Sequence, residues 1–177
     1  MDEPAQALVP ACFELDAIPA GRAILHLKTW ARAPLTLADL DSDGRGGARL
    51  LALGPGEWLM MSEGINGPAL HADVASLARS RGLAAVDLSD GMAGLVLGGS
   101  ASRDILSAAC GLDLHPNAFP VGSCTRTRLA QLPVVIVCTG MTRYELYVGA
   151  SYVRYLEAWL RDAGAGLSNW SGSVGIN

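Results

Sequence analysis

The sequence predicts an α+β fold of mostly antiparallel sheets with helices on one face, arranged as two small lobes. Both halves of the chain contain β-prone segments, a hairpin and an amphipathic helix. No segment has the glycine pattern of a dinucleotide-binding unit. We expect an irregular lead-in over residues 1–22, one domain over 23–164 with lobes at 23–82 and 83–164, and a flexible tail over 165–177.

The charge and apolar content of the chain limit the kinds of molecule that it can bind. Of the 177 residues, 50% are hydrophobic and 17% are charged, and the formal net charge is −4 with a single lysine, Lys28. This balance argues against nucleic acids and anionic membranes as partners. The apolar surplus fits a buried subunit interface, although Ala and Gly richness also contributes to it. Since no apolar run is long enough to span a bilayer and the first residues are acidic, we expect a cytoplasmic protein.

The first lobe follows a proline-containing stretch, which is why residues 1–22 are expected to be irregular. Residues 23–30 are apolar and predict the first strand. Residues 49–53 and 58–62 flank glycines and a proline that supply the turn of a hairpin. A helix is predicted next because apolar residues recur at helical spacing before Gly82, namely Leu70, Val74, Leu77 and Ala78.

The second lobe begins with two short strands over residues 86–97, broken at 89–91. A helix is predicted over 101–110. From Cys124 the chain is β-prone and then apolar to Val137, turns at Gly140 and returns over 144–148, which predicts a second hairpin.

The last predicted helix starts near Ser151 and ends before Gly164. Its aliphatic stripe is expected to face the sheet. Its aromatic stripe, with Tyr155 and Trp159, is either a wider core contact or a partner surface, and core contact is the more common arrangement. The tail keeps Trp170 among glycines and serines.

The strongest local candidate for an anion site is Gly98-Gly99-Ser100, because free N–H groups at a helix N-terminus bind anions. The segment lacks the lysine and spacing of a phosphate-binding loop, so an ordinary helix start is the favoured interpretation.

The four cysteines stand singly and predict reduced thiols. Cys110, His115 and Cys124 are the only combination that suggests a metal site, and their spacing favours a buried thiol and a loop histidine instead. No grouping of His, Ser, Cys or carboxylates predicts a catalytic site.

Arg126 and Arg128 alternate along one predicted strand, so both guanidinium groups should lie on the same face. Such a pair can bind a carboxylate or phosphate, face solvent, or form ion pairs across an interface. The apolar composition favours the interface.

Several of these segments resemble the gamma subunit of heterotetrameric sarcosine oxidase. The most specific run is Cys110 to Val134, which includes Cys124-Thr125-Arg126-Thr127-Arg128. It is preceded by 86–106 and followed by 144–160, and Gly54-Pro55-Gly56-Glu57-Trp58-Leu59 resembles an earlier strand. The resemblance extends from about Leu50 to Gly164, and the residues before it match poorly.

The resemblance implies a fold like that of the folate-binding aminomethyltransferases (glycine-cleavage T-protein), although none of their folate-contacting residues maps onto this sequence. It also implies a scaffold role beside alpha, beta and delta subunits that hold FAD, FMN, NAD, zinc and tetrahydrofolate. The implied reaction is oxidative demethylation of sarcosine or a related N-methyl amino acid. The candidate partner contacts are Arg126, Arg128, Tyr155, Trp159 and Trp170. The alternative is a free-standing folate-binding or aminomethyltransferase-like protein.

Overall fold

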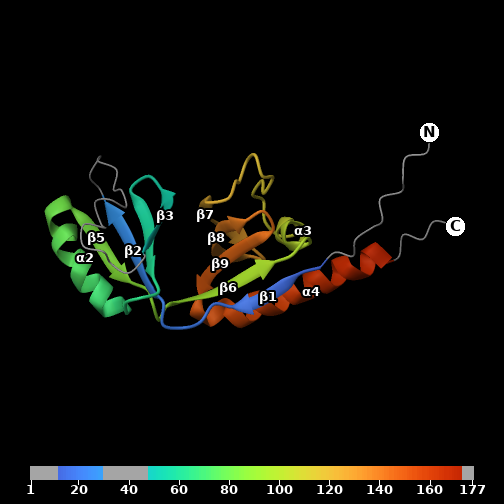
Figure 1. The fold of residues 1–177 in the computed structure, drawn as a ribbon, viewed down its shortest axis with the longest axis horizontal. Coiled ribbons are helices and arrows are strands. Elements are labelled where there is room, and N and C mark those ends of the chain that lie inside the picture. Colours follow the sequence, from blue (N-terminus) through green and yellow to red (C-terminus); the bar gives the residue numbers. More distant parts are fainter. Residues whose placement is uncertain (1–11, 30–47, 173–177) are drawn as a thin grey trace.

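The computed structural model describes residues 12–29 and 48–172, which form two antiparallel sheets and their covering helices (Figure 1). The strands are β1 (Glu14–Ala17), β2 (Ala23–Thr29), β3 (Arg49–Gly54), β4 (Glu57–Ser62), β5 (Leu83–Asp87), β6 (Met92–Gly98), β7 (Cys124–Leu129), β8 (Leu132–Gly140) and β9 (Arg143–Gly149). The helices are α2 (Gly67–Arg81), α3 (Ser102–Ser107), the 3-10 turn η1 (Ala150–Tyr152) and α4 (Val153–Gly172). One sheet has the strand order β3-β4-β2-β5 and the other β1-β6-β9-β8-β7.

The two sheets pack face to face, and each carries its helices on the opposite face. Leu25 and Met60 pack against Val74 of α2, whereas their neighbours Ile24 and Met61 pack against Val137 and other residues of the second sheet. This alternation follows from the period of two of a strand. The predicted α+β class, with antiparallel sheets and helices on one face of each, is confirmed.

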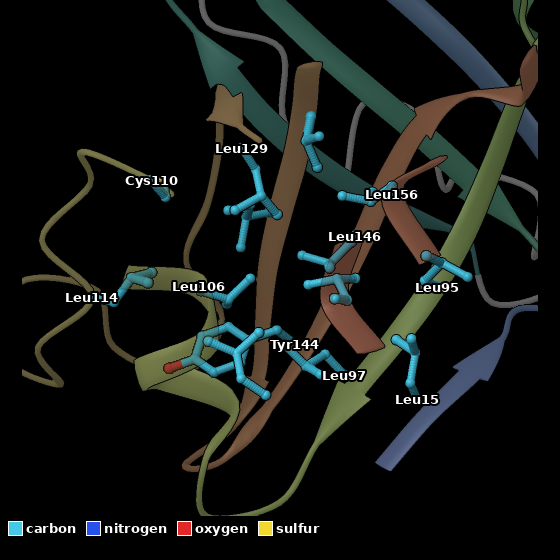
Figure 2. Close-up of a cluster of buried hydrophobic side chains, with 14 of the residues drawn as sticks. Leu15, Leu95, Leu97, Leu106, Cys110, Leu114, Leu129, Tyr144, Leu146 and Leu156 are labelled. Carbon is cyan, nitrogen blue, oxygen red and sulfur yellow. The ribbon is translucent and has the colours of Figure 1, made fainter. Parts of the chain in front are cut away.

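The largest cluster of buried side chains lies between the five-stranded sheet and helices α3 and α4. Figure 2 shows Leu97, Leu146 and Tyr144 converging from β6 and β9 toward Leu106 of α3, with Leu156 of α4 nearby. All five of these side chains are completely buried. The aliphatic stripe of α4 therefore faces the sheet, as predicted.

The predicted boundary between the lobes is wrong by one strand on each side. β5 pairs with β2, so residues 83–87 belong to the four-stranded sheet. β1 pairs with β6, so the lead-in predicted to be irregular supplies an edge strand of the five-stranded sheet. Only Leu15 of β1 is buried, and a four-residue strand with one inward side chain leaves no periodic signal in the sequence.

The apolar stretch predicted as one strand of a hairpin is divided by a tight turn between β7 and β8. Ala130 and Gln131 both have positive φ, at 49° and 70°. Two-residue hairpin turns of this conformation usually contain Gly or Asn, so no local pattern in the sequence indicates it. Tertiary contacts hold it, because Ala130 is buried, its N–H donates to the Ala109 carbonyl, and Arg128 donates to the Gln131 carbonyl at 3.0 Å.

Helix α4 continues past the predicted stop at Gly164 to Gly172, so the segment from 165 to 172 is helical and not a flexible tail. Gly164 is buried inside the helix, where the ring of Phe13 occupies the space that a side chain would need. The glycine therefore permits close packing of the lead-in on α4 and does not end the helix. Residues 173–177 of the predicted tail lie outside the described residues.

This packing predicts that Gly164→Ala destabilises the chain. A Cβ at this position would lie 2.6 Å from Phe13 Cδ1, so the ring must move. We expect a loss of about 1–3 kcal/mol in the free energy of unfolding, measured by chemical denaturation. Gly166→Ala is the matched control, because a Cβ added there would meet nothing within 4 Å and alanine favours the helix. Equal stabilisation by both substitutions would contradict the assigned role of Gly164.

Candidate functional site

The most concentrated group of polar side chains lies at the edge of the apolar layer between the two sheets. Glu145 of β9 is at its centre, with its side chain only 14% exposed. Arg49 of β3 donates to Glu145 Oε2 at 2.5 Å, and the Tyr147 hydroxyl donates to the same oxygen at 2.8 Å. Arg22 donates to the Tyr147 hydroxyl at 2.6 Å and also pairs with Glu63. The network thus connects both sheets.

The pKa values of Glu145 and Tyr147 shift in opposite directions. Burial alone would raise the pKa of Glu145, but hydrogen bonds from Arg49 and Tyr147 outweigh it and hold the pKa below its ordinary value of 4.5. Burial and the hydrogen bond to the Glu145 carboxylate raise the pKa of Tyr147 well above its ordinary value. The network therefore combines an ionised carboxylate with a neutral phenol. Because Arg49 and Arg22 balance the charge of the Glu145 carboxylate, the geometry is that of a structural contact.

A second polar contact bridges the two sheets. Glu57 Oε1 lies 2.8 Å from His26 Nε2 and 2.8 Å from the Arg126 guanidinium of β7. Burial would raise the pKa of Glu57, but the hydrogen bonds from His26 and Arg126 outweigh it and lower the pKa. Cys124 of β7 also donates to the Ala52 carbonyl of β3 at 3.0 Å.

The predicted interface residues are not brought together. Arg126 and Arg128 are both exposed, as expected for alternate positions, but Arg126 pairs with Glu57 of its own chain and Arg128 with the turn at Gln131. On α4, Tyr155 is 52% exposed, whereas Trp159 is half-buried against the core. The aromatic stripe is thus divided between partner-accessible and core positions. The side chain of Trp170 lies outside the described residues.

The glycine segment before α3 is occupied by the chain itself. The Cys12 carbonyl accepts from the Ala101 N–H at 3.0 Å, and the Gly99 carbonyl accepts from the Ser102 N–H at 3.1 Å. Gly99 has a φ of +97° and lies against the backbone of residues 12 and 13. The glycines therefore allow the lead-in to approach closely, which is the structural alternative to an anion site.

The cysteines and histidines of the described segments do not form a metal-binding group. Cys110 is buried beside Thr127, His115 lies exposed in its loop, and Cys124 faces β3. Burial raises the pKa of Cys124 and of Cys138, so both thiols favour the protonated form. Among the helices described, none is long and apolar enough to cross a membrane.

A pocket of about 280 Å³ lies beside the polar network. Its walls include Ile18, Arg22, Asp90, Met92 and Tyr147, which come from both sheets and from the segments that connect them. A shallower hollow of about 220 Å³ adjoins it and is lined by residues 19–22 and Glu63.

Sequence reasoning missed Arg22, Arg49, Glu145 and Tyr147 as a group. The available signal was Glu145 itself, a charged residue within the apolar β9 segment, together with Tyr147 on the same face of the strand. A strand that is buried on both faces needs a partner for such a charge. The sequence did not show which distant residues supply it.

Comparison with known proteins decides the family. The model of the sarcosine oxidase, gamma subunit family matches residues 16–166. The chain belongs to this family. The gamma subunit of sarcosine oxidase from Corynebacterium sp. (strain U-96) is 32% identical over 151 residues, which cover 84% of this chain and 72% of the relative. The family match begins before Leu50, so the resemblance extends further toward the N-terminus than the sequence motifs alone indicated.

Solved structures agree with this assignment to the gamma subunit family. A chain of the heterotetrameric sarcosine oxidase from Corynebacterium sp. U-96, solved in complex with pyrrole 2-carboxylate, superposes with a TM-score of 0.76 and 28% identity, covering 90% of this chain and 87% of that one. The glycine cleavage system aminomethyltransferase T from Bartonella henselae superposes with a TM-score of 0.58 and 15% identity, covering 85% and 45%. The second likeness shows the fold alone, and it confirms the expected relation to the aminomethyltransferase fold.

The polar network predicts a pH dependence of stability. The pKa of Glu145 is depressed in the folded chain, so its stabilising effect is present above about pH 4.5 and is lost as the pH falls through the folded-state value. Glu145→Gln should lower the free energy of unfolding by about 1–3 kcal/mol at neutral pH, because Arg49 loses its charged partner and Arg22 loses one of its two. The difference from the unmodified chain should shrink in acid, as measured by urea denaturation across pH.

Glu157→Gln is the control for this experiment. Glu157 pairs with Arg161 at 2.9 Å on the exposed side of α4, where an ion pair contributes about 0.3–0.5 kcal/mol. If both substitutions have equally small effects at every pH, the buried network does not stabilise the fold as described.

Proposed function

We propose that this chain is a non-catalytic assembly subunit, of gamma type, in a heteromeric sarcosine-oxidase-like flavoenzyme. The observation that carries the proposal is the family match over residues 16–166. The similarity to a chain of a heterotetrameric sarcosine oxidase along 90% of this chain supports it. The complex oxidatively demethylates sarcosine or a related N-methyl amino acid and works in the cytoplasm.

The proposed partners are alpha, beta and delta subunits, which supply FAD, FMN, NAD, zinc and tetrahydrofolate. A scaffold role is supported by the way in which charged groups of this chain pair with one another. Arg22 and Arg49 are held by Glu145 and Glu63, and Arg126 by Glu57. These contacts stabilise the packing of the two sheets, which gives partner subunits a rigid surface on which to assemble.

The test is co-expression with the proteins encoded by neighbouring genes. We expect the chain to co-purify in a fixed ratio with subunits that show flavin absorbance and oxidise sarcosine. A chain that elutes as a monodisperse monomer and never associates with flavin-bearing partners would overturn the proposal.

A free-standing folate-binding or aminomethyltransferase-like protein is not favoured. The likeness to the aminomethyltransferase is at 15% identity and concerns the fold alone. Calorimetric titration of the isolated chain with tetrahydrofolate separates the two functions, since the assembly role predicts no binding in the micromolar range. Saturable micromolar binding would favour the folate-binding alternative.

Among the proposed partner contacts, Tyr155 provides the sharpest test. Tyr152 and Tyr155 are 49% and 52% exposed at the start of α4, and exposed tyrosines are frequent at the centres of protein interfaces. Tyr155→Ala should weaken association with the partner subunits by about tenfold, while the isolated chain unfolds within about 0.5 kcal/mol of the original.

Asp162→Ala, also exposed on α4, is the matched control and should bind partners normally. Trp159→Ala should instead destabilise the isolated chain, because this side chain packs against the core. If surface plasmon resonance shows that Tyr155→Ala binds the partner subunits normally, this face of α4 is not part of the interface.

A further inference from the structure

The pocket beside the polar network lies where the chain passes between the two sheets. The described chain crosses from one sheet to the other through residues 18–22, between β1 and β2, and through residues 88–91, between β5 and β6. Both segments line the pocket, and Figure 1 shows them together at the narrow junction between the two lobes. Anything bound in this pocket therefore touches both connections at once.

The interior of the pocket is apolar. Ile18, which follows β1, and Met92, the first residue of β6, line it, and Tyr147 forms a further wall. Gly94 keeps these walls close, because a Cβ there would lie 2.7 Å from Ile18 Cδ1 and 3.0 Å from Tyr147 Cε1. Such walls fit an extended hydrocarbon chain.

The charges around the pocket favour a cation. The charged residues that line the pocket and the adjoining hollow are one guanidinium, from Arg22, and two carboxylates, from Asp90 and Glu63. Arg22 is already engaged, because it pairs with Glu63 and donates to the Tyr147 hydroxyl. Asp90 is exposed, and its side chain has no hydrogen bond or ion pair to any residue in the described ranges. An incoming cation would thus find, in the lining of the pocket, one exposed carboxylate that is unpaired among the described residues.

We propose that this pocket receives a lysine or arginine side chain of a partner subunit. The long aliphatic stem of such a residue packs against Ile18, Met92 and Tyr147, while its charged end pairs with Asp90 near the opening. The inference rests on the proposed assembly function and adds to it the location and chemistry of one contact. Because the pocket is lined by both connections, the bound side chain contacts segments that lead to each of the two sheets.

The experiment uses the complete complex, purified by co-expression with its partner subunits. Asp90→Asn keeps the shape of the turn and removes the charge, and Asp90→Lys reverses it. We expect Asp90→Lys to weaken association of this chain by tenfold or more and Asp90→Asn by less. The dependence of association on salt should be steeper for the unmodified chain than for Asp90→Asn, since one ion pair is lost. Asp73→Lys, on the exposed side of α2, is the charge-matched control.

Thermal unfolding of each isolated variant checks that the fold is intact. If the unmodified chain and Asp90→Lys associate equally well, the pocket contact is wrong and the assembly function stands. If the unmodified chain fails to associate, the assembly function fails and the pocket contact with it. If the variants assemble normally but native mass spectrometry shows that they have lost a small bound cation, the pocket is a ligand site and the proposed docking is overturned.

Discussion

The structure depends on the contact between the inner faces of its two sheets. Ile24, Leu59 and Met61 pack there against Val135 and Val137, and the charged network around Glu145 closes one edge of the layer. Strands in both sheets must therefore be apolar on both faces, since each sheet also packs against helices. Placing Glu145 in such a strand is costly unless its charge is balanced, and two arginines and a tyrosine provide the balance.

The stacking of sheets and helices offers a second explanation for the high apolar content of the chain. Half of the residues are hydrophobic, which on its own suggests a large subunit interface. However, four stacked layers contain three apolar contacts, and each has its own buried cluster. Much of the apolar surplus is used within the chain. Large hydrophobic side chains that stay exposed, such as Tyr152 of η1 and Tyr155 of α4, are left for partners.

Local patterns in the sequence were sufficient to predict most helices and strands. They could not predict the features that depend on contacts between distant residues. The turn at Gly54 to Glu57 and the helix before Gly82 were predictable because glycine, proline and helical spacing act locally. The turn at Ala130 and Gln131, the strand at Glu14–Ala17 and the extension of α4 past Gly164 all depend on distant contacts. The same holds for the site, because Arg126 pairs with Glu57, which lies far away in the sequence and which no local pattern indicates as its partner.

The arrangement also explains why a chain with little chemistry of its own can serve an assembly. The polypeptide leaves the five-stranded sheet after β1 and returns to it at β6, so the whole four-stranded sheet is an insertion between two neighbouring strands. Its position is therefore fixed by two adjacent connections and by the apolar layer, not by a flexible linker. Two ion pairs between the sheets, Glu145 with Arg49 and Glu57 with Arg126, resist sliding of one sheet over the other. A partner that binds at the junction meets a preorganised surface, so little conformational entropy opposes the association.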